Sequence, residues 1–169
     1  FLHGLPIYSV SIALQRNNEI VLGVVYEVNQ DECFYAWKSG GAFLNQKSIH
    51  VSQNEHLKDS LIATGFPYYD YERVDSYFEV LKRIAQNSRG VRRMGSAAVD
   101  LVYTACGRFD AFFEYSLHAW DVAAGAFIVQ EAGGKISDFS GGNNWLFGKE
   151  IVASNGLLTK EVLEATKRI

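Results

Sequence analysis

Apolar and polar positions alternate along the first fifty residues, and this period of two indicates β-strands. Residues 7–14 alternate in this way, and residues 20–28 are mostly β-branched. A polar turn at residues 17–19 separates these two segments, so they predict an antiparallel hairpin. Two short aromatic strands around residues 40–41 extend the pattern. The chain is therefore expected to form an antiparallel sheet up to about Val51.

From about residue 60 the pattern changes, and helices are expected to alternate with short strands. Apolar residues recur at helical spacing in several segments, for example at Val74, Tyr77 and Leu81. The expected helices cover residues 71–88, 95–107, 119–132 and 157–168, and the expected strands cover residues 60–66, 90–94, 108–115, 134–139 and 149–155. This order predicts a layered α/β fold. We expect it to divide into residues 1–57, with the antiparallel sheet, and residues 58–169, with the α/β part.

Composition and charge exclude several classes of protein. Of the 169 residues, 48% are hydrophobic and 21% are charged, as in an ordinary globular domain. The net charge is −3, the sequence pI is about 5.8, and no basic tract occurs. Neither a nucleic acid nor an anionic membrane is therefore expected as a partner.

The cysteines and the start of the chain bear on where the protein works. Cys33 and Cys106 lie far apart without a metal-binding spacing, which favours a reduced, cytoplasmic setting over a disulfide framework. Residues 1–14 lack the basic start and the long apolar run of a signal peptide or membrane span. The chain begins without methionine and enters a strand almost at once, so we expect a fragment of a longer protein.

Asp121 is the first candidate for chemistry, because it lies in the first turn of an otherwise apolar, small-residue helix. A carboxylate there is stabilised by the free amide groups and the positive end of the helix dipole. A capping role explains its position without any ligand. A fixed anionic oxygen at a helix tip is also what Mg²⁺ requires of a protein ligand. The two interpretations are compatible, and the residue alone does not decide between them.

Two further candidates lie where strands meet helices. Gly95, Ser96 and Ala97 join a strand to a helix, so free backbone N–H groups can meet a polar ligand there, although Ser96 is equally explained as a helix cap. Glu114 lies at the carboxyl end of a strand, where α/β sheets place ligands, although a structural role is as simple. His118 has no obvious partner and is interpreted as a packed residue beside Trp120, which is assigned to the core.

The segments "MGSAAVDLVYTACGRFDAFFE" and "HAWDVAAGAFIVQEAGGKISDFSGG" resemble the C-terminal half of the inositol monophosphatase family. The second contains the pattern W-D-x-A-A-G followed by E-A-G-G, which is specific to that family. The start of the chain and the strand "LGVVYEV" resemble the segment that follows the family's D-P-x-D-G-T-T-N motif. The resemblance therefore covers nearly the whole chain, and it implies the αβαβα sandwich of the sugar phosphatases.

The resemblance implies a magnesium-dependent hydrolysis of phosphate monoesters, most simply of inositol monophosphate to inositol and phosphate. It makes Asp121 a ligand of Mg²⁺ and a substrate contact, and it raises the metal interpretation above the capping one. It also makes Gly95, Ser96 and Ala97 contacts of the substrate, and Glu114 a partner of the sugar-alcohol hydroxyl groups. A homodimer is expected on the same ground.

The chain departs from the family pattern at one point. It contains neither D-P-x-D-G-T-T nor the upstream G-E-E, so the primary metal-binding carboxylates and the residues that activate water are not in this sequence. We expect these 169 residues to be inactive alone and the longer protein to be a phosphatase.

Alternatives remain open at this stage. The substrate could instead be fructose-1,6-bisphosphate, 3′-phosphoadenosine phosphate or histidinol phosphate, with residues 65–74 as the loop that would make the difference. A non-catalytic regulatory binding protein is the alternative from another class.

Overall fold

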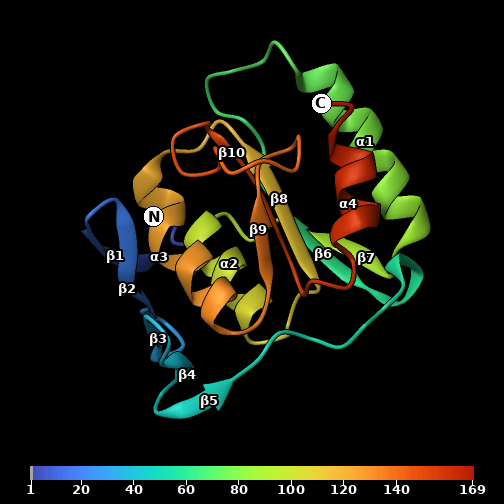
Figure 1. The fold of residues 1–169 in the computed structure, drawn as a ribbon. Coiled ribbons are helices and arrows are strands. Elements are labelled where there is room, and N and C mark those ends of the chain that lie inside the picture. Colours follow the sequence, from blue (N-terminus) through green and yellow to red (C-terminus); the bar gives the residue numbers. More distant parts are fainter. Residues whose placement is uncertain (1) are drawn as a thin grey trace.

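A computed structural model describes residues 2–169 and contains two five-stranded sheets (Figure 1). The first sheet is antiparallel throughout, and its strands follow one another in chain order. These strands are β1 (Ser9–Arg16), β2 (Glu19–Glu27), β3 (Glu32–Trp37), β4 (Gly41–Leu44) and β5 (Lys47–Ile49). The predicted hairpin and meander are thereby confirmed.

The second sheet is mixed and has the strand order β7-β6-β8-β10-β9. Strand β6 pairs in parallel with both β7 and β8, whereas β10 pairs antiparallel with β8 and β9. The 3₁₀ turn η1 (Leu57–Asp59) leads into this sheet. Its strands are β6 (Leu61–Thr64), β7 (Gly90–Arg92), β8 (Ala111–Tyr115), β9 (Lys135–Ser137) and β10 (Glu150–Ser154).

Helices α2 (Ala97–Ala105) and α3 (Ala119–Glu131) lie between the two sheets, as Figure 1 shows. Both helices are buried over most of their surface, which explains why their sequences are apolar on nearly every side. Small residues allow the close packing. A Cβ at Gly125 of α3 would lie 2.6 Å from Leu101 Cβ in α2, and one at Gly23 of β2 would lie 2.7 Å from the Ala124 carbonyl oxygen.

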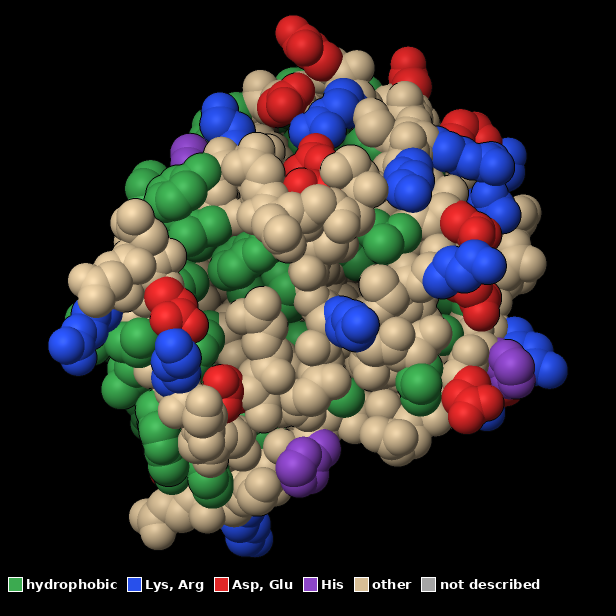
Figure 2. Space-filling model, in the orientation of Figure 1, with side chains coloured by type: hydrophobic (Ala, Val, Ile, Leu, Met, Phe, Trp, Pro, Cys, Tyr) green, Lys and Arg blue, Asp and Glu red, His purple; other side chains and the backbone are tan. Residues whose placement is uncertain are grey.

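Helices α1 (Val74–Asn87) and α4 (Thr159–Thr166) cover the other face of the second sheet (Figure 1). Each of these helices buries only a few side chains. In α1 the buried residues are Tyr77, Val80 and Ile84, which pack against the sheet in a second apolar cluster. Lys, Arg, Asp and Glu side chains are mixed over the surface of these helices (Figure 2). Among residues 2–169, no helix has both the length and the apolar character needed to cross a lipid bilayer.

The predicted fold class is confirmed, because an antiparallel sheet is followed by an α/β part around a shared core. Residues 2–169 form four of the five expected layers, in the order β-α-β-α (Figure 1). The outer face of the first sheet carries exposed apolar side chains, including Val10, Ile12 and Leu14 of β1. Apolar side chains are visible along this edge of the molecule (Figure 2). No helix of the described residues covers that face.

Residues 50–60 form the segment that links the two sheets, from the end of β5 to the start of β6. This linking segment is fixed by Asp110, which is 4% exposed. One oxygen of its carboxylate accepts hydrogen bonds from Ser52 Oγ at 2.5 Å and Asn54 Nδ2 at 2.9 Å. The other oxygen accepts the backbone N–H of Leu61 at 2.6 Å. Asn155 completes the network by donating to Ser52 Oγ and to the Asn54 carbonyl. The linking segment is thereby bound to the start of β6, to the residue before β8 and to the end of β10.

Candidate functional site

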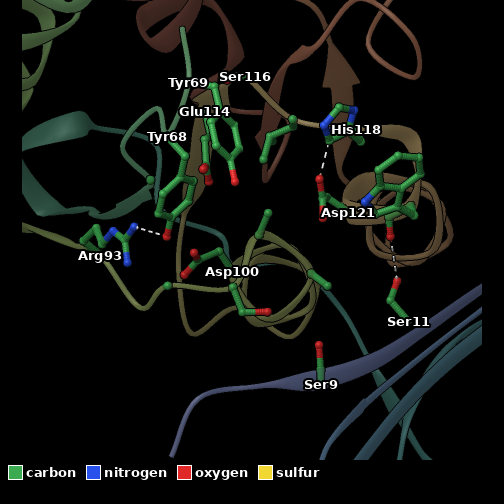
Figure 3. Close-up of a pocket in the computed structure, with 17 residues that line it drawn as sticks. Ser9, Ser11, Tyr68, Tyr69, Arg93, Asp100, Glu114, Ser116, His118 and Asp121 are labelled. Carbon is green, nitrogen blue, oxygen red and sulfur yellow. Dashed lines mark hydrogen bonds between the residues drawn. The ribbon is translucent and has the colours of Figure 1, made fainter. Parts of the chain in front are cut away.

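A pocket of about 490 Å³ opens where the N-terminal ends of α2 and α3 meet the carboxyl ends of β6 and β8 (Figure 3). All five residues selected from the sequence line this pocket: Gly95, Ser96, Ala97, Glu114 and Asp121. They come from three separate elements. The fold therefore brings together residues that are up to 26 positions apart along the chain (from 95 to 121).

The Gly95-Ser96-Ala97 turn forms one wall of the pocket. Gly95 has a φ of +100°, a conformation that side chains with a Cβ rarely adopt, so glycine is needed for the turn. Ser96 caps α2, because its side chain accepts a hydrogen bond from Val99 N at 3.4 Å. The capping interpretation of Ser96 is therefore correct. Its place on the pocket wall leaves a ligand contact open, since the first N–H groups of a helix have no partner within the helix.

Glu114 reaches into the pocket from β8 and is only 6% exposed. Burial is the main reason why its pKa rises to about 8; the nearby guanidinium of Arg93 opposes this rise, and the carboxylate of Asp121 adds to it. The carboxyl group lies directly against the backbone of Gly65, which follows β6, the strand next to β8. The position of Glu114 is thus confined by Gly65, and burial favours the neutral, protonated form of its carboxyl group.

Asp121 lies in the first turn of α3 and is half-buried at the pocket wall. Its Oδ2 accepts the backbone N–H of His118 at 2.9 Å (Figure 3). The capping role considered for this aspartate is therefore present. Oδ1 makes no hydrogen bond with the residues that the structure describes, so one carboxylate oxygen is available to a ligand in the pocket.

Asp100 is a pocket residue that was not selected from the sequence. It is 1% exposed, and neither carboxyl oxygen has a hydrogen-bond partner among residues 2–169. Burial, and then the charge of Glu114, raise its pKa to about 9, while Arg93 acts in the opposite direction. The available signal was a single acidic residue within the apolar run of residues 97–105. An acid that is neutral at pH 7 can donate as well as accept a hydrogen bond.

Arg93 and Tyr68 form the outer wall of the pocket and were also not selected. Arg93 Nη2 donates to Tyr68 Oη at 2.6 Å (Figure 3). The guanidinium also lies 5.5 Å from the ring centre of Phe66 and 5.6 Å from that of Tyr68. Tyr68 belongs to residues 65–74, the loop proposed to control substrate choice. Arg93 is the single Lys or Arg among the described residues that line this pocket.

Trp120 corrects one expectation. It was assigned to the core, but its side chain is 70% exposed and stacks on the ring of His118, with ring centres 4.4 Å apart. The assignment was wrong because the N-terminal turn of α3 emerges from between the sheets, which an apolar sequence pattern does not reveal. His118 lines the pocket through this same turn.

The buried acid Asp100 predicts how stability depends on pH. Because its folded pKa is raised far above its ordinary value of 3.8, the folded state binds a proton that the unfolded state releases, and stability falls as pH rises from about 4 to 9. Asp100→Asn, which does not titrate, should therefore gain stability relative to the native protein by more than about 1 kcal/mol between pH 5 and pH 8.

Thermal unfolding of the whole protein at both pH values measures this difference. Asp75→Asn makes the same chemical change at an exposed position in α1 and serves as the control. A difference between Asp100→Asn and native protein that is the same at both pH values would contradict a neutral Asp100.

The donor set for a metal ion is incomplete within the described residues. No group of three or more His, Cys, Asp or Glu side chains among residues 2–169 is arranged to hold a metal. Asp121 fits a hard cation as one anionic oxygen ligand on a rigid helix end. The remaining ligands would have to come from elsewhere.

The protein has an antiparallel sheet and a mixed sheet with two buried helices between them, and an acidic pocket lies at the ends of these helices. This arrangement defines a class of α/β proteins. The whole chain, residues 1–169, matches the inositol monophosphatase family. The chain belongs to this family.

Among its relatives, the inositol-1-monophosphatase of Mesorhizobium japonicum is 41% identical over 99% of the chain. The putative Nus factor SuhB of Neisseria meningitidis serogroup B is 43% identical over 97% of the chain. The chain spans 63% of the length of each of these proteins.

Solved structures agree closely with the fold. The extragenic suppressor protein SuhB of Bartonella henselae matches with a TM-score of 0.94 and 42% identity, covering 98% of this chain and 64% of that one. The Thermotoga maritima IMPase matches with a TM-score of 0.90 and 40% identity, covering 99% of this chain and 63% of that one.

Proposed function

We propose that the whole protein hydrolyses phosphate monoesters of sugar alcohols in a magnesium-dependent reaction, most simply inositol monophosphate to inositol and phosphate. The observation that carries this proposal is the convergence of Asp121, Glu114 and the Gly95–Ala97 turn on one pocket. The name of the Mesorhizobium relative, an inositol-1-monophosphatase, supports the same substrate.

Each part of the pocket has a chemical role in this proposal. Asp121 offers Oδ1 to the metal ion, while its bond to the His118 N–H keeps the carboxylate oriented. The Gly95-Ser96-Ala97 turn provides N–H groups and a hydroxyl group for polar atoms of the substrate. Glu114 binds hydroxyl groups of the alcohol part, because its buried carboxyl group can accept and donate hydrogen bonds.

Magnesium, when bound, supplies Lewis-acid activation of water and neutralises charge on the phosphate group. This chain would contribute one ligand, Asp121, and the resemblance assigns the other carboxylates to the N-terminal part of the family. These 169 residues are therefore proposed to hold the substrate and to supply one ligand for the metal ion, and to be inactive alone.

The proposal is tested by measuring phosphate release from inositol 1-phosphate by the whole protein, with added Mg²⁺ and after removal of metal by EDTA. We expect hydrolysis with Mg²⁺ and a loss of about 100-fold or more without it. Fructose-1,6-bisphosphate, 3′-phosphoadenosine phosphate and histidinol phosphate are tested beside it. If one of these esters is hydrolysed with a higher kcat/KM than inositol 1-phosphate, that ester becomes the proposed substrate.

A second candidate is a regulatory binding protein without catalysis. The names of two relatives favour it, the putative Nus factor SuhB of Neisseria meningitidis and the Nus factor SuhB of Pseudomonas aeruginosa. That role does not need a pocket lined by three acidic residues. Absence of hydrolysis of all these phosphate esters, with Mg²⁺ present, would favour the regulatory role.

A cytoplasmic homodimer is proposed as the form in which the protein works. The cysteines support a reducing compartment, because Cys33 and Cys106 are both free. The dimer rests on the family resemblance alone. Sedimentation of the whole protein distinguishes a dimer from a monomer.

A further inference from the structure

Gly65, directly after β6, leaves no room for a side chain because Glu114 occupies the space. A Cβ at Gly65 would lie 2.1 Å from both Cδ and Oε1 of Glu114 and 2.2 Å from Oε2. Real Cβ atoms do not approach other heavy atoms so closely. Gly65 has no positive φ, so the backbone conformation would accept a side chain, and an added Cβ would be opposed only by the carboxyl end of Glu114, which would have to move. Gly65 therefore forms the surface against which the carboxyl group of Glu114 rests.

Two buried hydroxyl groups hold Gly65 in this place. The hydroxyl of Tyr77, from α1, donates to the carbonyl oxygen of Gly65. Thr64 Oγ1 lies 2.6 Å from this hydroxyl and donates to the carbonyl oxygen of Phe113 at 2.7 Å. Phe113 immediately precedes Glu114 in β8. The same pair of hydroxyl groups thus fixes both backbones that determine where Glu114 lies.

Core packing alone does not explain this hydroxyl pair. The ring of Tyr77 already packs against Phe113 and Tyr115, with ring centres 5.9 Å and 5.6 Å away, and phenylalanine would make the same ring contacts. Tyr77 is 0% exposed, and burying a hydroxyl group has a cost unless it is hydrogen-bonded. The partners of this hydroxyl lie at the pocket end of the sheet, next to Glu114.

We propose that Gly65, fixed by the hydroxyl groups of Tyr77 and Thr64, is a positioning residue that aims Glu114 at the hydroxyl groups of the substrate alcohol. The residue at position 65 thereby sets the preference for polyol phosphates over phosphate esters without further hydroxyl groups. This inference rests on the proposed function. It adds a determinant of specificity that does not itself bind the substrate.

Gly65→Ala in the whole protein tests the inference. The added methyl group forces the buried carboxyl of Glu114 to turn away, so hydrogen bonds to substrate hydroxyl groups are lost. We expect kcat/KM for inositol 1-phosphate, divided by kcat/KM for p-nitrophenyl phosphate, to fall by about 10-fold or more, mainly through KM. Tyr77→Phe keeps the ring but frees Gly65, and the same ratio should fall by a smaller factor.

Rescue by a second change separates positioning from damage to the fold. Glu114→Asp shortens the side chain by one methylene group and withdraws the carboxyl from the new methyl group. Gly65→Ala combined with Glu114→Asp should therefore have a higher ratio than Gly65→Ala alone, by several-fold. Gly40→Ala is the matched control, because its Cβ would meet another side chain, Trp37 Nε1, at 2.0 Å in the first sheet, away from the pocket.

The outcomes separate the two proposals. If the native protein hydrolyses both esters and Gly65→Ala leaves their ratio within twofold of native, the positioning role is wrong while the proposed function stands. A ratio in the double variant no higher than in Gly65→Ala also overturns it, since a general loss of structure has no such rescue. If the native protein hydrolyses neither ester, the proposed function fails, and this inference fails with it.

Discussion

Asp121→Asn is expected to reduce the Mg²⁺-dependent hydrolysis of inositol 1-phosphate by about 100-fold or more, with little change in folding. The amide oxygen of asparagine can still accept the His118 N–H, as Asp121 Oδ2 does at 2.9 Å, so the helix cap is retained. The change removes the negative charge that a hard cation requires, and it leaves the shape of the side chain. Stability should change by no more than about 1 kcal/mol, because only the helix-dipole contribution is reduced.

Steady-state kinetics over a range of Mg²⁺ concentrations, calorimetric titration with Mg²⁺ and thermal unfolding check this prediction. Weaker metal binding together with an unchanged melting temperature is the expected pattern. Asp75→Asn is the matched control, since Asp75 lies in the first turn of α1, where it is exposed and outside the pocket. Full activity of Asp121→Asn at low Mg²⁺, with a loss of stability only, would reduce Asp121 to a helix cap.

Asp110→Ala is expected to destabilise the fold by about 3 kcal/mol. The carboxylate is 4% exposed and accepts hydrogen bonds from Ser52, Asn54 and the backbone of Leu61. Alanine removes the shared acceptor of these three donors, of which Ser52 and Leu61 are half-buried and Asn54 is exposed, and it frees the segment that links the two sheets. Asp110→Asn keeps one acceptor oxygen, so it should lose about half as much.

Urea unfolding of the whole protein gives these free energies from the shift in the midpoint. Asp59→Ala changes an exposed aspartate in the same linking segment, and it should alter stability by less than about 0.5 kcal/mol. An effect of Asp110→Ala as small as that of Asp59→Ala would show that the linking segment does not depend on this network.

The sequence was sufficient to predict the architecture because most of its elements are periodic and have clear ends. The alternation in residues 7–14 and 20–28 indicated the first hairpin, and the shift to helical spacing after residue 60 indicated the α/β part. Element ends differ from expectation by a few residues. Helix α1 begins at Val74 and not at residue 71, because Tyr68, Tyr69 and Tyr71 belong to an exposed loop before it.

The sequence also identified the acids and the glycine turn through local rules. Asp121 was recognised from its place in a first helical turn, Glu114 from the end of a strand, and the turn at Gly95 from the junction of strand and helix. Each of these positions has a simple structural explanation as well. The family motif was needed to favour the functional one.

The tertiary structure alone decided which distant residues share the pocket and in what state they are held. Asp100 became a candidate because its buried carboxyl group has no hydrogen-bond partner among residues 2–169, and this burial depends on the packing of α2 against the sheet. Gly65 became a candidate positioning residue because β6 and β8 run side by side and bring its backbone against Glu114. Hydrophobic periodicity specifies which face of each element is buried. A contact between residues 49 positions apart, such as that of Thr64 with Phe113, depends instead on how all the layers pack.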